Sequence, residues 1–259
     1  MRSHISFSEL KIWNECAFKH KLVYIDEAKK FLGNEHTAFG TAMHHVCEVM
    51  LTEDKDQNFK DLFNNKFLEE LSLLKNKNVE LKKDLVLSMR KQCDNIISYI
   101  MPAMKKTFGK FEVVSVEERL YEPIENEKTK FKGFIDLVVK TEDEKYHVID
   151  WKTCSWGWDS KRKADSMTTY QLTLYKHFFA LKHNIDPKNI ETHFALLKRT
   201  AKSNNVEIFR VTSGAKKTEN AINLLNKAIY NIENNKHIKN RLSCTSGFGC
   251  EFYETKYCR

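Results

Sequence analysis

Two short acidic motifs near the middle of the chain carry residue types suited to metal-assisted hydrolysis. Asp136 ends the motif G-F-I-D, and Asp150 and Lys152 lie within V-I-D-W-K-T. On a β-strand Asp150 and Lys152 would project from the same face, because they are two residues apart. Two carboxylates and a lysine in apolar surroundings are costly to desolvate without a compensating partner. A divalent cation would compensate them, and beside a lysine it would activate water against a phosphodiester.

Two antiparallel strands must position these groups. Residues 131–140 and 146–152 are mostly apolar and are joined by the polar turn 141–145, which predicts a hairpin. Asp136 then lies inside the first strand and Asp150 near the end of the second. A plainer interpretation stays open at this point, because aspartate often forms turns at strand ends and D-x-K triplets arise by chance.

Helical patterns precede the hairpin, and both strands and helices follow it. Ser6 and Glu9 form a capping box that opens a helix running to about Tyr24. Further helices are expected at 37–52, 58–75, 79–101, 165–183 and 216–236, and further strands at 111–121, 190–199 and 205–211. Pro102 is expected to end or kink the helix before it. Strands, a crossover helix and more strands favour an α/β fold with a central mixed β-sheet flanked by helices.

Length and composition bound the class of protein. We expect one domain over residues 1–259, with a helical part over about 1–108, a sheet core over about 109–212 and a C-terminal helix and cysteine segment over about 213–259. The 43 basic and 35 acidic residues give a net charge of +8, which favours an anionic partner such as nucleic acid, although lysines on solvated helix faces would give a similar sum.

No apolar run approaches the roughly 18 residues of a membrane span. The N-terminus lacks the apolar region of a signal peptide, so we expect a cytoplasmic protein with no membrane partner.

A candidate metal ligand lies in the helix expected at 37–52. Gly40, His44 and Glu48 recur every fourth residue and share one helical face. Gly40 would permit a close backbone approach, and His44 could offer a metal-ligating nitrogen. A lone histidine on a helix is more often an ordinary surface or core residue, so this motif is open by itself.

A polar pair lies on the helix expected at 165–183. Tyr170 and Gln171 adjoin each other, and Gln171 and Tyr175 form an i,i+4 pair. Such a pair can hydrogen-bond a phosphate or a base, and it can equally border a core.

The seven cysteines are unevenly placed. In a chain without an export signal they are expected to be reduced or metal-bound rather than disulfide-linked. Three of them crowd the C-terminal end: Cys244, Cys250 and Cys258. Three scattered ones are interpreted as small core residues: Cys47, Cys93 and Cys154.

Taken together, the order G-x-x-x-H, G-h-I-D, h-I-D-x-K-T and Y-Q-x-x-x-Y resembles the RecB-type branch of the PD-(D/E)XK nuclease superfamily, with which the CRISPR-adaptation and AddB nucleases belong. The motifs run from Gly40 to Tyr175. Each motif alone has little specificity, whereas four in this order and spacing form a specific signal. The resemblance implies a restriction-endonuclease-like core with an N-terminal helical insertion.

The resemblance also implies roles for individual residues. The implied ligands of Mg²⁺ or Mn²⁺ are His44, Asp136, Asp150 and the backbone carbonyl of Trp151. Lys152 would position or activate the attacking water and stabilise the charged transition state. The residues implied to place the DNA strand are Tyr170, Gln171 and Tyr175. A hard, oxygen-rich site suits Mg²⁺, but Glu48 and Glu118 are not assigned as ligands.

Some members of this branch hold a 4Fe–4S cluster through one cysteine near the N-terminus and three near the C-terminus. Cys16, within W-N-E-C-A-F-K, matches the first, and Cys244, Cys250 and Cys258 match the others. Such a cysteine clamp would tie the ends of the chain together around the nuclease core. The usual pattern contains a short C-x-x-C, whereas the gaps here are five and seven residues. Four thiolates suit iron–sulfur or zinc, and free thiols are a third alternative.

The sequence therefore predicts a metal-dependent deoxyribonuclease, an exonuclease acting on strand ends. One alternative is a nucleic-acid-binding subunit whose nuclease fold has lost turnover, but the intact His/Asp/Asp/Lys set argues against it. Another is a redox or sensor protein built on the cysteines, which would leave the D-x-K hairpin unexplained. DNA recombination, repair and CRISPR adaptation are all open as pathways. No helicase motif is present, so any unwinding requires a partner such as a helicase, a recombinase or another recombination or CRISPR protein.

Overall fold

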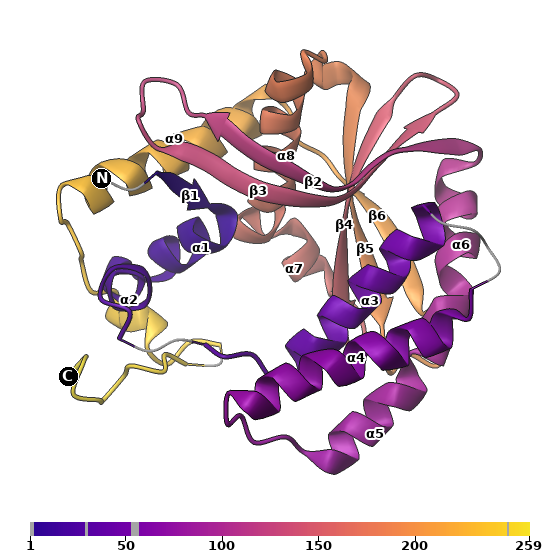
Figure 1. Cartoon of the computed structure of the whole chain (residues 1–259). Helices are drawn as coiled ribbons and strands as arrows, with labels where there is room; N and C mark the ends of the chain where they lie inside the picture. The colour runs from indigo at the N-terminus through magenta and orange to yellow at the C-terminus, as the bar shows by residue number, and fades with distance from the viewer. Residues whose placement is uncertain (1–2, 29–30, 53–56, 248) are drawn as a thin grey trace.

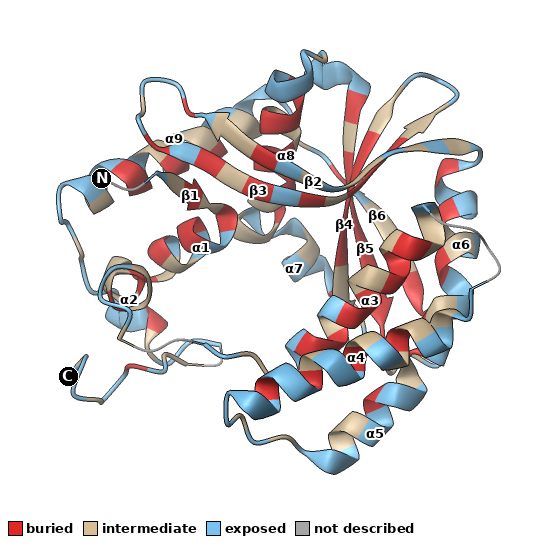
Figure 2. Cartoon of the chain, in the orientation of Figure 1, coloured by how far each residue is buried: buried red, intermediate tan, exposed pale blue. Residues whose placement is uncertain are grey.

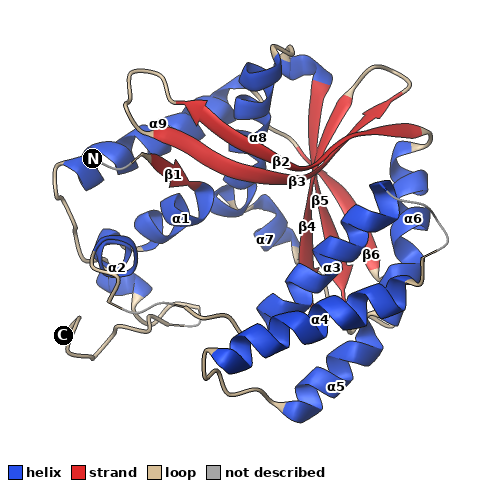
Figure 3. Ribbon diagram, viewed as in Figure 1, coloured by secondary structure: helices blue, strands red, loops and turns tan. Residues whose placement is uncertain are grey.

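The computed structural model describes residues 3–28, 31–52, 57–247 and 249–259. Within these residues, six strands form one sheet that mixes parallel and antiparallel pairs (Figure 3). The strands are β1 (His4–Ser6), β2 (Phe111–Pro123), β3 (Lys130–Thr141), β4 (Tyr146–Cys154), β5 (Ile190–Lys198) and β6 (Val206–Val211). The predicted α/β architecture, a central mixed sheet flanked by helices, is confirmed.

Helices lie on both sides of this sheet (Figure 1). The α-helices are α1 (Phe7–Glu15), α2 (Ala17–His20), α3 (Glu35–Thr52), α4 (Phe59–Asn76), α5 (Lys83–Gln92), α6 (Asp94–Phe108), α7 (Ser160–Ala164), α8 (Ser166–His183) and α9 (Ala215–Glu233). A π-helix spans Lys21–Ile25, and short 3-10 turns span Pro187–Asn189 and Arg241–Ser243. None of the helices in the described part of the chain is both long and apolar enough to cross a membrane.

Two apolar clusters cover the two faces of the sheet. One cluster packs α1, α8 and α9 against Phe194 and Leu196 of β5. The other packs α3 to α6 against Ala195 and Leu197, the alternate residues of the same strand. Because both faces are covered, β4 and β5 are largely buried between the helical layers (Figure 2), and both of their faces carry apolar residues.

The strand order explains how the hairpin is held. β3 and β4 pair antiparallel, as predicted, and β2 runs antiparallel along the other edge of β3. β4 pairs in parallel with β5 after the chain crosses back through α8, and β6 pairs antiparallel with β5. β1, which the sequence did not predict, pairs in parallel with the start of β3 over His4–Ser6.

The first predicted helix is shorter than expected. Ser6 caps it as predicted, since its hydroxyl accepts a 3.2 Å hydrogen bond from the Glu9 N–H. However, the helix does not run to Tyr24, because Cys16 has extended backbone and ends α1. The Cys16 sulfur then caps α2 by accepting from the Lys19 N–H.

The predicted helix 79–101 is also wrong in its limits. It is divided at Cys93 into α5 and α6. Pro102 lies inside α6, which continues to Phe108, so the proline does not end the helix. The packing of Met104 and Phe108 in the core accounts for this continuation, since burial of apolar side chains offsets the loss of one backbone hydrogen bond.

Candidate active site

The two predicted aspartates meet where β3 and β4 separate. The β3–β4 ladder ends at the Leu137–Ile149 pair, beyond which the two strands separate and form a fork. The first residue of each strand beyond this pair is an aspartate, Asp136 on β3 and Asp150 on β4. In place of a further backbone pair, Oδ2 of Asp136 accepts a 2.7 Å hydrogen bond from the Trp151 N–H. The fork therefore brings two carboxylates side by side without exposing unpaired backbone.

Asp150 is connected to α8 on one side and to Lys152 on the other. Its Oδ1 accepts a 2.8 Å hydrogen bond from Nε2 of Gln171, which also donates to the Tyr175 hydroxyl at 3.2 Å. Nζ of Lys152 lies 2.6 Å from Oδ2 of Asp150, on the same face of β4 as predicted. The Lys152 side chain is 33% exposed and the Asp150 side chain only 2%, so the ammonium group borders solvent above a buried carboxylate.

Helix α3 brings His44 to the aspartates. Nδ1 of His44 lies 3.6 Å from Oδ1 of Asp136. Burial is the main reason that the pKa of His44 lies below its usual value, although the Asp150 carboxylate opposes it. The imidazole is therefore neutral near physiological pH and keeps a lone pair for a metal. A Cβ at Gly40 would lie 3.4 Å from Oγ1 of Thr153, an ordinary van der Waals distance, so this position of α3 does not require a glycine.

Glu117 of β2 is a further acid beside His44 and Asp136, and no sequence motif indicated it. The β2–β3 register puts Glu117 opposite Asp136, and ligand atoms of His44, Glu117 and Asp136 lie within 4.8 Å of one another. Only the pairing register of β2 with β3 places Glu117 next to Asp136. That register depends on a bulge between Val113 and Ser115, which the sequence pattern does not reveal.

Crowding of the acids changes their protonation. Burial is the largest cause that raises the pKa of Asp136 well above its usual value, and the neighbouring Asp150 raises it further. Burial also raises the pKa of Glu117, with added contributions from Glu48 and Asp150. A bound cation would reverse these effects, since it stabilises the ionised carboxylates.

The donor set fits a divalent cation. Oδ2 of Asp150 is buried and, among the described residues, has no hydrogen-bond donor, because Lys152 is close to it without the alignment of a hydrogen bond. This oxygen is ion-paired with the Lys152 ammonium, and the Asp150 carboxylate is close enough to Asp136 and His44 to raise the pKa of the first and to oppose the lowering of the pKa of the second. Carboxylate oxygens with one imidazole are ligands of Mg²⁺- and Mn²⁺-type ions.

The remaining predicted residues lie in different surroundings. Tyr170 is partly buried against the apolar cluster of α1, α8 and α9. Tyr175 is 7% exposed, and burial raises its pKa above the usual value, so its hydroxyl stays neutral. Glu118 forms ion pairs with Lys182 and His183 of α8.

The four cysteines of the expected clamp line one pocket. They are Cys16, Cys244, Cys250 and Cys258. Figure 1 shows α2 in indigo beside the yellow C-terminal segment, and the Asn240 N–H donates to the Cys16 sulfur at 3.3 Å across 224 residues of sequence. Partial loss of solvation raises the pKa of Cys244, and the other three sulfurs raise it further. None of the seven cysteines, all of which lie in the described part of the chain, forms a disulfide bond.

Comparison with known proteins identifies the family. The sequence profile of the PD-(D/E)XK nuclease superfamily matches residues 4–258. The chain belongs to this superfamily. The narrower resemblance to its RecB-type branch stays a prediction, and no curated protein matches the chain.

Two solved structures are similar to this PD-(D/E)XK chain. The crystal structure of a candidate exonuclease from Eubacterium rectale has a TM-score of 0.61 and 12% sequence identity, over 94% of this chain and 86% of that one. At this identity the likeness shows the fold alone. The structure of SSO0001 has a TM-score of 0.35 and 14% identity, over 75% of this chain and 86% of that one.

Proposed function

We propose that the chain is a divalent-metal-dependent deoxyribonuclease that shortens DNA from strand ends. The observation that carries this proposal is the convergence of Asp136, Asp150, Lys152 and His44 at the fork between β3 and β4. Membership of a nuclease superfamily supports phosphodiester hydrolysis. The net charge of +8 supports an anionic substrate.

Mg²⁺ or Mn²⁺ would be held by His44, Asp136, Asp150 and the Trp151 carbonyl, with Glu117 as an additional candidate ligand. When bound, the cation would polarise a phosphoryl oxygen and lower the pKa of a water. The protein presets these ligands: the Trp151 N–H fixes Asp136, and Gln171 fixes Asp150. Fixed ligands need little reorganisation during the reaction.

Lys152 would act on the water and on the phosphate. In hydrolysis, the water oxygen forms a bond to phosphorus, the bond to the leaving oxygen breaks, and a proton ends on the leaving oxygen. The partly exposed ammonium of Lys152 can orient the attacking water and stabilise the negative charge that grows on the phosphoryl oxygens. Gln171, Tyr175 and Tyr170 are the residues proposed to place the DNA strand, the first two at the site itself.

The test is degradation of end-labelled linear DNA with Mg²⁺ or Mn²⁺. Asp150→Asn and Lys152→Ala should each lower the rate by about a hundredfold or more, and EDTA should stop the wild type. Lys188→Ala, which removes an exposed lysine ahead of β5, serves as the control and should keep full activity. Wild-type cleavage by folded Lys152→Ala would disprove the assignment.

A covalently closed circle of the same sequence tests the exonuclease part of the proposal. An enzyme that needs strand ends should leave the circle intact while it degrades the linear form. Cleavage of both at similar rates would instead indicate an endonuclease.

We further propose that the cysteine clamp holds a 4Fe–4S cluster. The shared pocket of the four cysteines and their mutual effect on the pKa of Cys244 support this. Protein purified without oxygen should be brown and contain about four irons per chain. In a colourless preparation, a zinc that is lost in Cys16→Ser would show that zinc replaces the cluster and keeps the clamp, and equal metal content in the wild type and Cys16→Ser would exclude both.

A further inference from the structure

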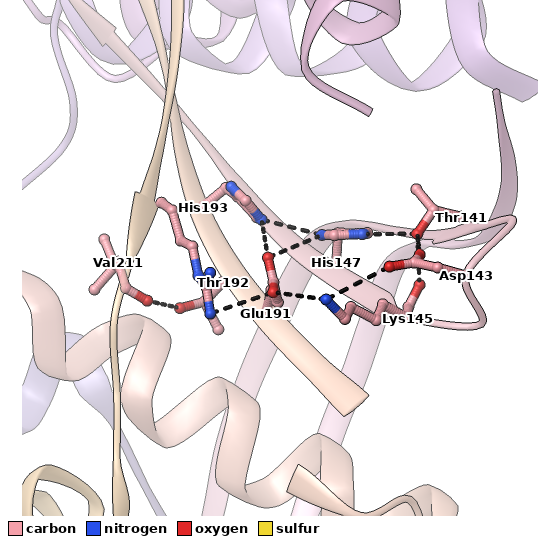
Figure 4. Close-up of polar contacts among 9 residues, drawn as sticks. Thr141, Asp143, Lys145, His147, Glu191, Thr192, His193 and Val211 are labelled. Carbon is pink, nitrogen blue, oxygen red and sulfur yellow. Dashed lines mark hydrogen bonds and ion pairs between the residues drawn. The ribbon is translucent and has the colours of Figure 1, made fainter. Parts of the chain in front are cut away.

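A second group of metal-ligating side chains lies near the start of β4 and β5, away from the candidate active site. It consists of His147, Glu191 and His193, and one ligand atom of each lies within 4.8 Å of the other two. Nδ1 of His147 and Nε2 of His193 are 3.1 Å apart. Oε2 of Glu191 lies 3.9 Å from the first nitrogen and 4.0 Å from the second. Figure 4 shows the three side chains pointing toward one another.

The strand register explains why these residues meet. β4 and β5 are parallel, and His147 pairs directly with Glu191. Glu191 and His193 are two residues apart and project from one face of the sheet. Asp150 is three residues from His147 along β4 and therefore projects from the opposite face. The cluster is thus separate from the carboxylates of the fork.

Thr141 and Asp143 set the proton on His147. Oγ1 of Thr141 lies 3.0 Å from Nε2 of His147 and donates its own hydrogen to Asp143. The hydroxyl oxygen can then only accept from the His147 Nε2–H, which leaves the imidazole lone pair on Nδ1. Metal-ligating histidines commonly have their second nitrogen fixed in this way.

Glu191 directs one oxygen to the histidines. Its Oε1 is engaged by Lys145 at 3.5 Å and by Arg210 at 3.2 Å. Its Oε2 faces the two imidazoles instead. The two basic side chains reduce the negative charge at the site, so binding would depend mainly on the imidazole nitrogens. Such a site favours zinc-class cations over Mg²⁺.

Both imidazoles are available as neutral ligands. His193 is 5% exposed, and burial, followed by the proximity of His147, lowers its pKa to about 3. Burial also lowers the pKa of His147. A hydrogen bond between the two rings would use one nitrogen of each but would leave Oε2 of Glu191 unused, whereas a cation would engage all three atoms.

We propose that Nδ1 of His147, Nε2 of His193 and Oε2 of Glu191 bind one Zn²⁺ ion or a similar divalent cation. Zinc–nitrogen bonds of about 2.0–2.1 Å in tetrahedral geometry separate two nitrogens by about 3.3 Å, close to the 3.1 Å here. A small rotation of Glu191 would complete the third bond. A water molecule can occupy the fourth coordination position of the cation. It can enter through a pocket that is lined by His147, Glu191, Phe108 and Lys110.

A cation in this position would link the starts of two neighbouring strands and so stabilise the sheet. The test is the number of Zn²⁺ ions retained per chain after dialysis against zinc with excess Mg²⁺, which occupies hard oxygen sites. The cysteine pocket can also bind zinc, but it is unchanged in every variant and therefore adds the same amount to each zinc count. His147→Gln and His193→Gln should each retain one zinc fewer than the wild type, and His177→Gln, a half-buried histidine outside the cluster, should match the wild type.

Two further variants keep the proposal testable if a histidine variant fails to fold. Thr141→Val preserves shape but removes the group that fixes His147, and it should weaken zinc binding about 10–100-fold. Glu191→Gln should weaken it at least as much, and zinc should raise the melting temperature of the wild type more than that of either variant. Equal zinc content and equal melting shifts in the wild type and the folded variants would overturn the site.

Discussion

At the residue scale, Asp136 and Asp150 at the fork are arranged to bind a cation, and this arrangement lowers the stability of the metal-free protein. Asp136 and Asp150 are buried close together, and only Lys152 supplies a nearby full positive charge at the fork among the described residues. Adjacent buried carboxylates repel each other, so one keeps its proton to higher pH than usual. The same crowding that destabilises the empty site provides ligands for a divalent ion.

Asp136→Asn should therefore stabilise the metal-free protein while abolishing cleavage. The raised pKa means that folded Asp136 keeps a proton that the unfolded chain releases above about pH 3.9. Between that value and the raised folded pKa, the folded state binds more protons, so the free energy of unfolding falls as pH rises. Asparagine can still accept from the Trp151 N–H. In EDTA, melts from about pH 4 to about pH 8 should show the variant becoming more stable than the wild type as the pH rises toward the upper end. Lower stability of the variant there would contradict this account.

Gln171→Ala should reduce turnover more than stability. Gln171 donates to Asp150 and orients it, and loss of a partner that orients a metal ligand typically costs about 10–100-fold in activity or metal affinity. Tyr175→Phe removes only the hydroxyl that accepts from Gln171, so its effect should be smaller. Rates and melting temperatures measured together decide the matter. A variant that loses folding without a separate catalytic defect would favour a purely structural role.

At the element scale, the site depends on the close approach of α8 to β3. A Cβ added at Gly133 would lie 2.8 Å from Cε1 of Tyr175, so Gly133→Ala must displace that ring. We expect a loss of about 1–3 kcal/mol in the free energy of unfolding and a drop in activity, since Tyr175 contacts Gln171. Gly214→Ala is the control, because nothing lies within 4 Å of its added Cβ. Equal stability of the two variants would show that α8 adapts freely.

The elements also show what the sequence could and could not reveal. Apolar runs and turn residues were sufficient to predict the β3–β4 hairpin. The placement of Asp150 beside Lys152 could also be predicted, because it depends only on local strand geometry. Glu117 was missed because its place follows from a bulge and from the pairing of β2 with β3. His147 and His193 were missed because their meeting depends on a parallel register across a long connection. Local periodicity does not encode such non-local pairings.

At the scale of the whole molecule, the two ends of the chain meet in the cysteine pocket. α2 and the C-terminal segment are joined there by the Asn240–Cys16 hydrogen bond, which spans 224 residues. The first apolar cluster also joins α1 to α9, so the ends contact each other through packing as well. A metal at the cysteines would turn this contact into a cross-link that closes most of the chain into one loop.

Such a cross-link should contribute strongly to stability. By analogy with disulfides that close long loops, it should stabilise the fold by about 4–5 kcal/mol, because it restricts the unfolded chain. Cys16→Ser should therefore lose the bound metal and lower the melting temperature together. Cys154→Ser, a partly buried cysteine outside the pocket, should leave the metal content unchanged. With His147→Gln added to both proteins, so that the proposed histidine zinc site is absent, stripping the metal should lower the melting temperature of the protein with intact cysteines toward that of Cys16→Ser and leave the Cys16→Ser protein unaffected. If metal removal changed neither protein, the ends would be held by packing alone, and the cysteines would not cross-link the chain.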